Sequence, residues 1–184
     1  MAIADGTYRL TPESGELLLK TSRTGMGRRA GHDLVIEVTR WQGEVTLVSA
    51  EPEQSTVSVE VDIDSFEIRE GLGGVKPLTN RDRASIKDTL RGLLDSKTHP
   101  KVTFSSTSVT GSAESATVAG DLTVRGETQP VTVSAELVDD RVRGSATVTQ
   151  TRWGIKPYTA FLGALKVADD VGVEFDAALV PAGA

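Results

Sequence analysis

The 184-residue sequence predicts an all-β fold with one main helix, an antiparallel β-barrel around an internal apolar cavity. Three observations lead to this prediction. Apolar and polar residues alternate along many segments, short turns separate these segments, and a single segment has helical spacing instead. Many short strands in close succession are typical of a sandwich or a barrel. The length and the 38% hydrophobic content fit one domain over residues 1–184.

Strand-like alternation is clearest in residues 57–63, whose apolar members are Val57, Val59, Val61 and Ile63. One face of such a strand is apolar and the other is polar, as in a half-buried sheet. The same alternation recurs in residues 118–124, 131–137, 142–148 and 171–179. Further strands are expected at residues 6–10, 16–22, 33–40, 44–49 and 101–108. Asp139-Asp140 is expected to form a hairpin turn, and residues 125–130 a polar Gly/Pro break.

The predicted helix runs from Thr79 to Leu94. Its apolar residues are Ile86, Leu90, Leu93 and Leu94, which share one helical face. Thr79 is the expected N-cap, and Asp82, three residues later, is its expected capping partner. A shorter apolar stretch, residues 161–165, is expected to form one or two helical turns.

Composition excludes several classes of function. The formal net charge is −6 and no basic block is present, which argues against nucleic acid and, for the same reason, against an anionic membrane surface. The absence of cysteine excludes disulfides, thiolate nucleophiles and iron–sulfur clusters. No apolar run reaches the length of a membrane span, so no stable membrane insertion is expected. The N-terminus lacks a signal-peptide pattern, which predicts a cytoplasmic location; an exported mature form and a homodimer stay open.

Few residues are candidates for catalysis or metal binding. His32, with Asp33 and Glu37 nearby, matches no familiar metal signature and is expected to bond Asp33 or a backbone group. The carboxylate pairs Asp139-Asp140 and Asp169-Asp170 are expected to be solvated. The Gly-rich residues 71–74 lack the Lys-Ser/Thr of a phosphate loop and suit a flexible entrance loop. We therefore predict no catalytic residue, no metal and no cofactor.

Small side chains at inward-facing positions predict that the barrel is hollow. Only 4% of the residues are aromatic, and Gly120, Gly144 and Ala146 stand where a packed core would have larger side chains. Closed sheets of about eight strands can hold one small ligand. The alternative is that these glycines only permit a bulge or sharp coiling of the sheet.

The few aromatic residues divide into two groups. Trp41, Trp153, Tyr158 and Phe161 are expected either to form a rim that touches a ligand at the barrel mouth or to plug one end of the barrel. Both interpretations stay open. The second group lies in strand patterns and is expected to line the interior: Phe66, Phe104 and Phe175.

Three segments resemble the YceI-like family. Residues 95–106, DSKTHPKVTFSS, resemble the segment that joins the family's helix to the next strand. Residues 118–131 are similar to its G-x-L-T-x-x-G-x-T-x-x-V stretch, and residues 59–66 fit the strand before the helix. The resemblance covers the chain roughly from Tyr8 to Leu179. The chain departs from the better-known exported members at residues 30–33 and 151–158.

The resemblance implies a lipocalin-like barrel that binds, transports or stores a long apolar ligand without catalysis. The implied partner is a polyisoprenoid, an isoprenoid quinone or another long-chain lipid. The residues expected to bind it are Phe66, Leu90, Leu94, Phe104, Leu122, Ala146, Trp153, Tyr158, Phe161 and Phe175. Two other functions remain alternatives: a metal-assisted hydrolase that uses His32, and a stress-response structural module with an incidental cavity.

Overall fold

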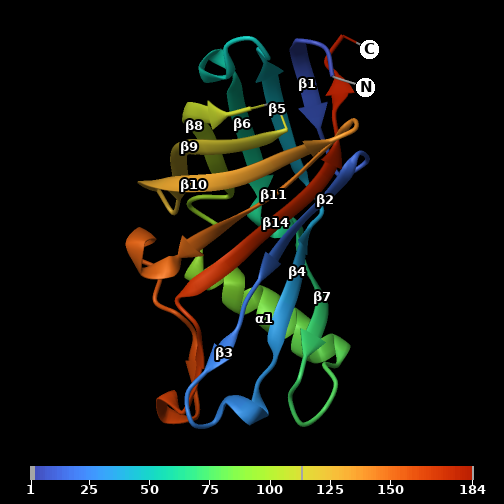
Figure 1. The fold of residues 1–184 in the computed structure, drawn as a ribbon. Helices are drawn as coiled ribbons and strands as arrows, with labels where there is room; N and C mark the ends of the chain where they lie inside the picture. Colours follow the sequence, from blue (N-terminus) through green and yellow to red (C-terminus); the bar gives the residue numbers. More distant parts are fainter. Residues whose placement is uncertain (1–2, 113, 184) are drawn as a thin grey trace.

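A computed structural model describes residues 3–112 and 114–183. Its main feature is a 12-stranded sheet in which the neighbouring strands are antiparallel. Figure 1 shows this sheet curling into a half-barrel, with α1 (Asn80–Leu93) packed beside β7. The predicted class, a lipocalin-like antiparallel β-barrel with one main helix, is confirmed.

The pairing order of the main sheet is sequential in part, and it also joins strands that lie far apart in the sequence. The order is β15 (Val180–Pro181), β1 (Gly6–Leu10), β5 (Trp41–Leu47), β6 (Thr56–Asp62), β8 (Lys101–Gly111), β9 (Ser115–Val124), β10 (Glu127–Val138), β11 (Arg141–Thr149), β14 (Asp170–Ala178), β2 (Gly15–Lys20), β4 (Asp33–Val38) and β7 (Phe66–Leu72). A small second sheet contains β12 (Thr159–Ala160), β13 (Leu165–Val167) and β3 (Arg23–Thr24).

Five 3₁₀ turns connect these strands. They are η1 (Arg28–Ala30), η2 (Pro52–Gln54), η3 (Ile63–Ser65), η4 (Gln150–Trp153) and η5 (Phe161–Gly163). η5 is shorter than the helical turns predicted for residues 161–165, because β13 begins at Leu165. None of the helices in the described part of the chain has the length and apolar character of a membrane span.

Most predicted strands are present, with shifted ends. β1 has the predicted bounds, and Asp139 turns the β10–β11 hairpin with a left-handed φ of 57°. The predicted break at residues 125–130 is wrong in length, because only Arg125 and Gly126 form the turn. Pro130 lies inside β10, beyond the part of that strand that pairs with β11, and proline is tolerated at such a position.

The predicted N-cap of α1 is confirmed. The Thr79 side chain accepts a hydrogen bond from the backbone N–H of Asp82 at 3.1 Å, and the Asp82 carboxylate accepts one from the Thr79 N–H at 2.8 Å. This reciprocal pair is a capping box, and it satisfies two of the backbone donors at the start of the helix. No residue of α1 is fully buried, although Ile86 and Leu90 pack against the core.

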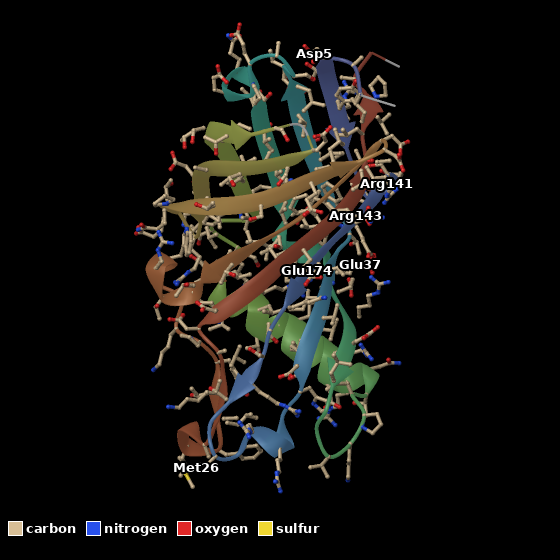
Figure 2. All side chains as sticks on the ribbon, viewed as in Figure 1. Asp5, Met26, Glu37, Arg141, Arg143 and Glu174 are labelled. Atoms are coloured by element: carbon tan, nitrogen blue, oxygen red, sulfur yellow. The ribbon has the colours of Figure 1, made fainter. Side chains whose placement is uncertain are left out.

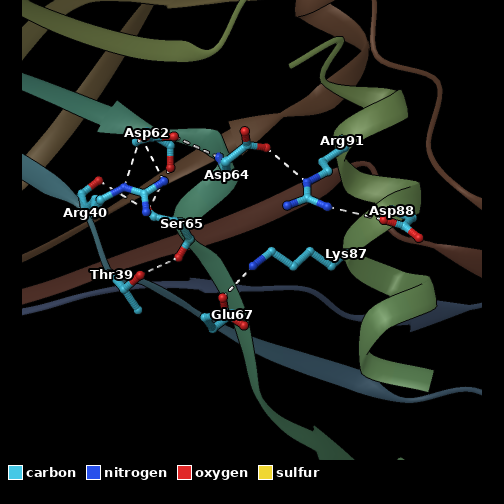
Figure 3. A network of polar contacts seen from close by, with 9 residues as sticks. All are labelled: Thr39, Arg40, Asp62, Asp64, Ser65, Glu67, Lys87, Asp88 and Arg91. Carbon is cyan, nitrogen blue, oxygen red and sulfur yellow. Dashed lines mark hydrogen bonds and ion pairs between the residues drawn. The ribbon is translucent and has the colours of Figure 1, made fainter. Parts of the chain in front are cut away.

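Polar contacts between α1 and the segment from η3 to β7 set the position of the helix (Figure 3). Arg91 donates to the Asp64 carboxylate at 3.0 Å, and Lys87 pairs with Glu67 on β7. Beneath them Ser65 is 1% exposed, and its hydroxyl donates to the carbonyl oxygen of Asp62 at 2.7 Å. Exposed ion pairs of this kind contribute little stability. Their effect here is to orient the helix against the end of the sheet.

Most of the buried apolar residues in the described part of the chain form two clusters. The larger one extends over the strands and includes Leu10, Ile36, Val38, Phe66 and Ala177. The smaller one lies where η4 meets β9 and β10 and consists of Val124, Val131, Trp153 and Ile155. We call this second group the Trp153 cluster.

Candidate functional site

An internal cavity of about 530 Å³ lies between the strands and α1. This volume is within the range of about 300–1,000 Å³ that is usual for small-molecule sites. Every strand of the main sheet except β15 contributes to its wall, as does α1. The wall includes Leu19, Ile36, Val59, Phe104, Val118, Val133, Ala146 and Val173 from the strands, Ile86, Leu90 and Leu93 from α1, and Leu94 directly after it.

Strand alternation explains why the cavity wall is apolar. In β10 the inward residues Val131, Val133 and Ala135 line the cavity, whereas Thr132 and Ser134 between them are exposed on the outside. Successive side chains of a strand point to opposite faces, so a period of two in the sequence becomes an apolar interior and a polar exterior.

Many wall residues are only half-buried, although they face inward, whereas others such as Ile36 and Val131 are buried. Val133, Ala146 and Val173 keep part of their surface accessible, while members of the Trp153 cluster keep almost none. A densely packed interior would cover these side chains from every side. Their remaining accessible surface borders the cavity, so the barrel is hollow and its hollow is apolar.

Eight of the ten predicted ligand-binding residues line the cavity. They are Phe66, Leu90, Leu94, Phe104, Leu122, Ala146, Tyr158 and Phe175. They come from six elements of the fold, from the residue after α1 and from the segment after η4, so only the curling of the sheet brings them together. Contact of these side chains with a ligand stays a prediction.

Trp153 does not line the cavity. It is 1% exposed, packs against Val124, Val131 and Ile155, and donates from its indole nitrogen to the carbonyl oxygen of Leu122 at 2.9 Å. η4 ends at Gly154 with a left-handed φ of 69°, a turn that favours glycine. Of the two interpretations of this aromatic group, Trp153 therefore fits the plug.

Phe161 does not line the cavity either. Its side chain is 67% exposed in η5, where both Phe161 and Leu162 have a left-handed backbone, with φ of 50° and 54°. The aromatic group around residues 153–161 is therefore not one site. It contains a buried plug at Trp153, a wall residue at Tyr158 and an exposed tip at Phe161.

The expectation of empty space above Gly120 and Gly144 is wrong. The ring of Phe104 occupies the place where a side chain on Gly120 would lie, and the ring of Phe175 does the same at Gly144. Phe175 is the direct cross-strand partner of Gly144. These glycines therefore let two aromatic rings lie flat on the sheet and become part of the wall. Ala146 has a different place, because it borders the cavity itself.

Sequence reasoning missed several wall residues. Leu19 on β2 and Ile36 on β4 line the cavity, and the alternation of their strands is the signal that could have identified them. Trp41, at the first position of β5, also lines the cavity, although the sequence placed it only in the aromatic group that either touches a ligand at the mouth or plugs the barrel. Its strand begins three residues earlier than predicted, so the pattern did not place it on a face.

The polar candidates His32 and Asp169 have structural roles. The His32 ring nitrogen Nε2 forms a hydrogen bond with the carbonyl oxygen of Lys76 at 2.7 Å, which is one of the two predicted arrangements. Asp169 is not merely solvated, because its carboxylate accepts from the backbone N–H of Thr151 at 2.9 Å and holds the start of η4. Among the residues that the structure describes, no group of three or more His, Asp or Glu side chains has metal-site geometry.

Comparisons with known proteins agree with the fold. The chain matches the YceI-like domain over residues 8–179. Burkholderia cenocepacia BcnA is 18% identical with a TM-score of 0.60, over 87% of this chain and 94% of that one. A Campylobacter jejuni YceI protein is 15% identical with a TM-score of 0.56, over 77% and 81% of the two chains. A search of curated proteins found no match.

Proposed function

Because the chain belongs to the YceI-like family, known for binding polyisoprenoids, we propose that it is a non-catalytic carrier or store for a long apolar molecule. The ligand is a polyisoprenoid or an isoprenoid quinone, held inside a single domain that spans residues 1–184. The observation that supports this proposal is the cavity of about 530 Å³ with an apolar wall on every strand of the main sheet except β15.

The energetics of the cavity favour a hydrocarbon ligand. Each buried CH₂ group contributes about 0.8 kcal/mol on transfer from water, so a chain of many such groups needs no charged anchor. Apolar cavities of this kind exclude water and bind apolar molecules instead. A ligand that fills the hollow also restores contacts that the half-buried wall residues lack.

Native mass spectrometry and lipid extraction of gently purified protein test the proposal directly. We expect a mass above that of the 19.5 kDa chain, and a long-chain lipid in the extract. A fluorescent isoprenoid analogue should bind the delipidated protein and be displaced by the extracted lipid. Protein that purifies empty and does not take up the analogue would refute the proposal.

Ala146→Phe tests whether the cavity is the binding site. The added ring projects into the hollow, so we expect analogue binding to fall about tenfold or more, while the free energy of unfolding changes by less than the ~1–3 kcal/mol of an overpacked core. Ser145→Phe is the matched control, because Ser145 is the preceding residue of β11 and is exposed outside the barrel. Normal binding by folded Ala146→Phe would place the ligand elsewhere.

A further inference from the structure

Exposed apolar side chains gather at one end of the molecule. Of the eight large apolar side chains that are exposed among the described residues, six belong to three loops: Met26, Leu72, Val75, Tyr158, Phe161 and Leu162. The loops span residues 22–32, 72–78 and 154–168, and we call them together the loop end. Figure 1 shows η1, η5 and the β7–α1 loop at the bottom of the view, away from both termini, and Figure 2 shows Met26 at the tip.

Specific contacts hold the three loops together. The backbone N–H of Gly27 donates to the carbonyl oxygen of Ala164 at 2.8 Å, which joins the first loop to the third. The bond between His32 and the carbonyl oxygen of Lys76 joins the first loop to the second. The exposed pair Phe161 and Leu162 has a left-handed backbone at both positions, which is costly for large side chains. The fold thus holds these exposed side chains in a backbone conformation that costs conformational energy.

The loop end is also basic. Its three loops contain six basic residues and no acidic residue: Arg23, Arg28, Arg29, Lys76, Lys156 and Lys166. Since the whole chain has a net charge of −6 and these loops contribute +6, the rest of the chain carries −12. Within the described residues, Arg23 is the only member of this set in an ion pair, with Asp33. The charge of this protein is therefore strongly segregated.

The cavity extends to the same end. Arg23, His32, Tyr158 and residues 165–167 all line it, and all of them belong to the three loops. A molecule that leaves or enters the cavity between these loops would pass the exposed apolar tips. The surface and the cavity therefore form one continuous region of the protein.

We propose that the loop end docks on the surface of an anionic lipid bilayer. Apolar side chains with basic residues beside them are the combination that binds at the headgroup level of such membranes. Lysines and arginines are attracted to acidic lipids there, within a Debye length of the surface. Net charge alone gives the opposite expectation, because it averages a positive end with an acidic body. This docking goes beyond ligand binding and does not require the cavity to be filled.

Vesicle flotation tests the docking. Wild-type protein should float with vesicles of equal parts phosphatidylcholine and phosphatidylglycerol, less at high salt, and should stay unbound with phosphatidylcholine alone. We expect Arg28→Glu/Arg29→Glu and Phe161→Ser/Leu162→Ser each to lower the partition coefficient about tenfold or more. The matched controls lie outside the loop end: Arg9→Glu/Lys97→Glu for charge and Val138→Ser/Val180→Ser for exposed apolar surface. Both should bind as the wild type does.

The outcomes separate docking from its alternatives. No binding to acidic vesicles by folded wild type, equal binding to both vesicle types, or an equal loss in the charge control would overturn the proposal. So would sedimentation showing that the loop-end variants break a dimer while their vesicle binding is unchanged, because the surface would then serve a second copy of the chain. Thermal melts of all four variants identify any loss that comes from misfolding. Analogue binding is read separately, so a failure of docking is distinct from a failure of the cavity proposal.

Discussion

The Trp153 cluster and the cavity wall are both apolar and share neighbouring strands, but their side chains are covered to different degrees. In the cluster, Val124, Val131, Trp153 and Ile155 are all buried. In the wall, residues such as Val133 and Ala146 point into the barrel and still keep accessible surface. The two regions overlap, because Val124, Val131 and Ile155 also border the cavity, and Trp153 is the cluster member that does not.

Because of this difference in coverage, the two regions should contribute differently to the stability of the fold and to ligand binding. Trp153 does not border the cavity and is 1% exposed, so it gains nearly the full dispersion and transfer energy of burial. Wall side chains lack neighbours on the cavity side, so they contribute less to stability and have surface left for a ligand. Substitutions should therefore have unequal costs in the two regions, even where the residue types are alike.

The largest effect is expected for Trp153→Ala. The substitution removes a side chain that is 1% exposed, together with its hydrogen bond to Leu122, and should lower the free energy of unfolding by about 3–5 kcal/mol. Urea denaturation measures this change. Tyr158→Ala is the control, because this side chain lines the cavity but is 46% exposed, and it should cost far less. Equal costs would mean that the cluster is not better packed than the wall.

The two regions also differ in how well the sequence predicts them. The wall follows from alternation, because a period of two fixes which side chains share a face. Phe104 and Phe175 were placed in the interior on that basis. Alternation does not specify which strands pair with each other. It therefore could not show that these rings cover Gly120 and Gly144. The rings fill the space that the glycines alone would have left empty.

Residues 150–165 were predicted least well. Their sequence has no regular period, and the directions of Trp153 and Phe161 depend on backbone turns at Gly154 and at η5. Aromatic content alone predicted one group, either a rim or a plug, where the structure has a plug at Trp153, a wall residue at Tyr158 and an exposed tip at Phe161. The basic loop end was missed for a related reason. Its six charges come from three distant segments, and only the fold brings them together.

The second prediction compares one aliphatic residue from each region. Leu90→Ala on α1 should cost about 1–2 kcal/mol, below the ~2–5 kcal/mol of a packed core, because Leu90 borders the hollow and is not fully buried. Ile155→Ala in the Trp153 cluster should cost more than Leu90→Ala, because Ile155 is only 5% exposed, although it also borders the cavity. Denaturation of delipidated protein measures both. With ligand bound, the cost of Leu90→Ala should rise, and a cost that is independent of ligand would argue that Leu90 does not contact it.

The smallest effect concerns how α1 stays folded beside a hollow. Since no residue of this helix is fully buried, its local interactions carry more weight than in a packed helix. Thr79→Ala removes the N-cap and should lower the free energy of unfolding by about 1 kcal/mol at neutral pH. Thr89→Ala, the same substitution inside the helix, should change it by less than about 0.5 kcal/mol.

The cost of losing the cap should also depend on pH, with a sign that the capping box fixes. The hydrogen bond from the backbone N–H of Thr79, and then that from its hydroxyl, hold the pKa of Asp82 below its ordinary value. A carboxyl whose pKa is lower in the folded state stabilises the fold above its unfolded pKa, and this contribution disappears as the pH falls through the folded value. The difference between wild type and Thr79→Ala should therefore begin to shrink as the pH falls below the unfolded pKa of an aspartate, about 3.9, and should shrink further as the pH falls through the lower folded pKa of Asp82. The Thr89→Ala difference should stay constant over the same range. Alanine keeps the backbone N–H of residue 79, so this difference reports only the bond from the Thr79 hydroxyl to Asp82. If the Thr79→Ala difference were constant too, that bond would contribute nothing through the charge of the carboxylate, and the hydroxyl would act only as the acceptor for the Asp82 N–H.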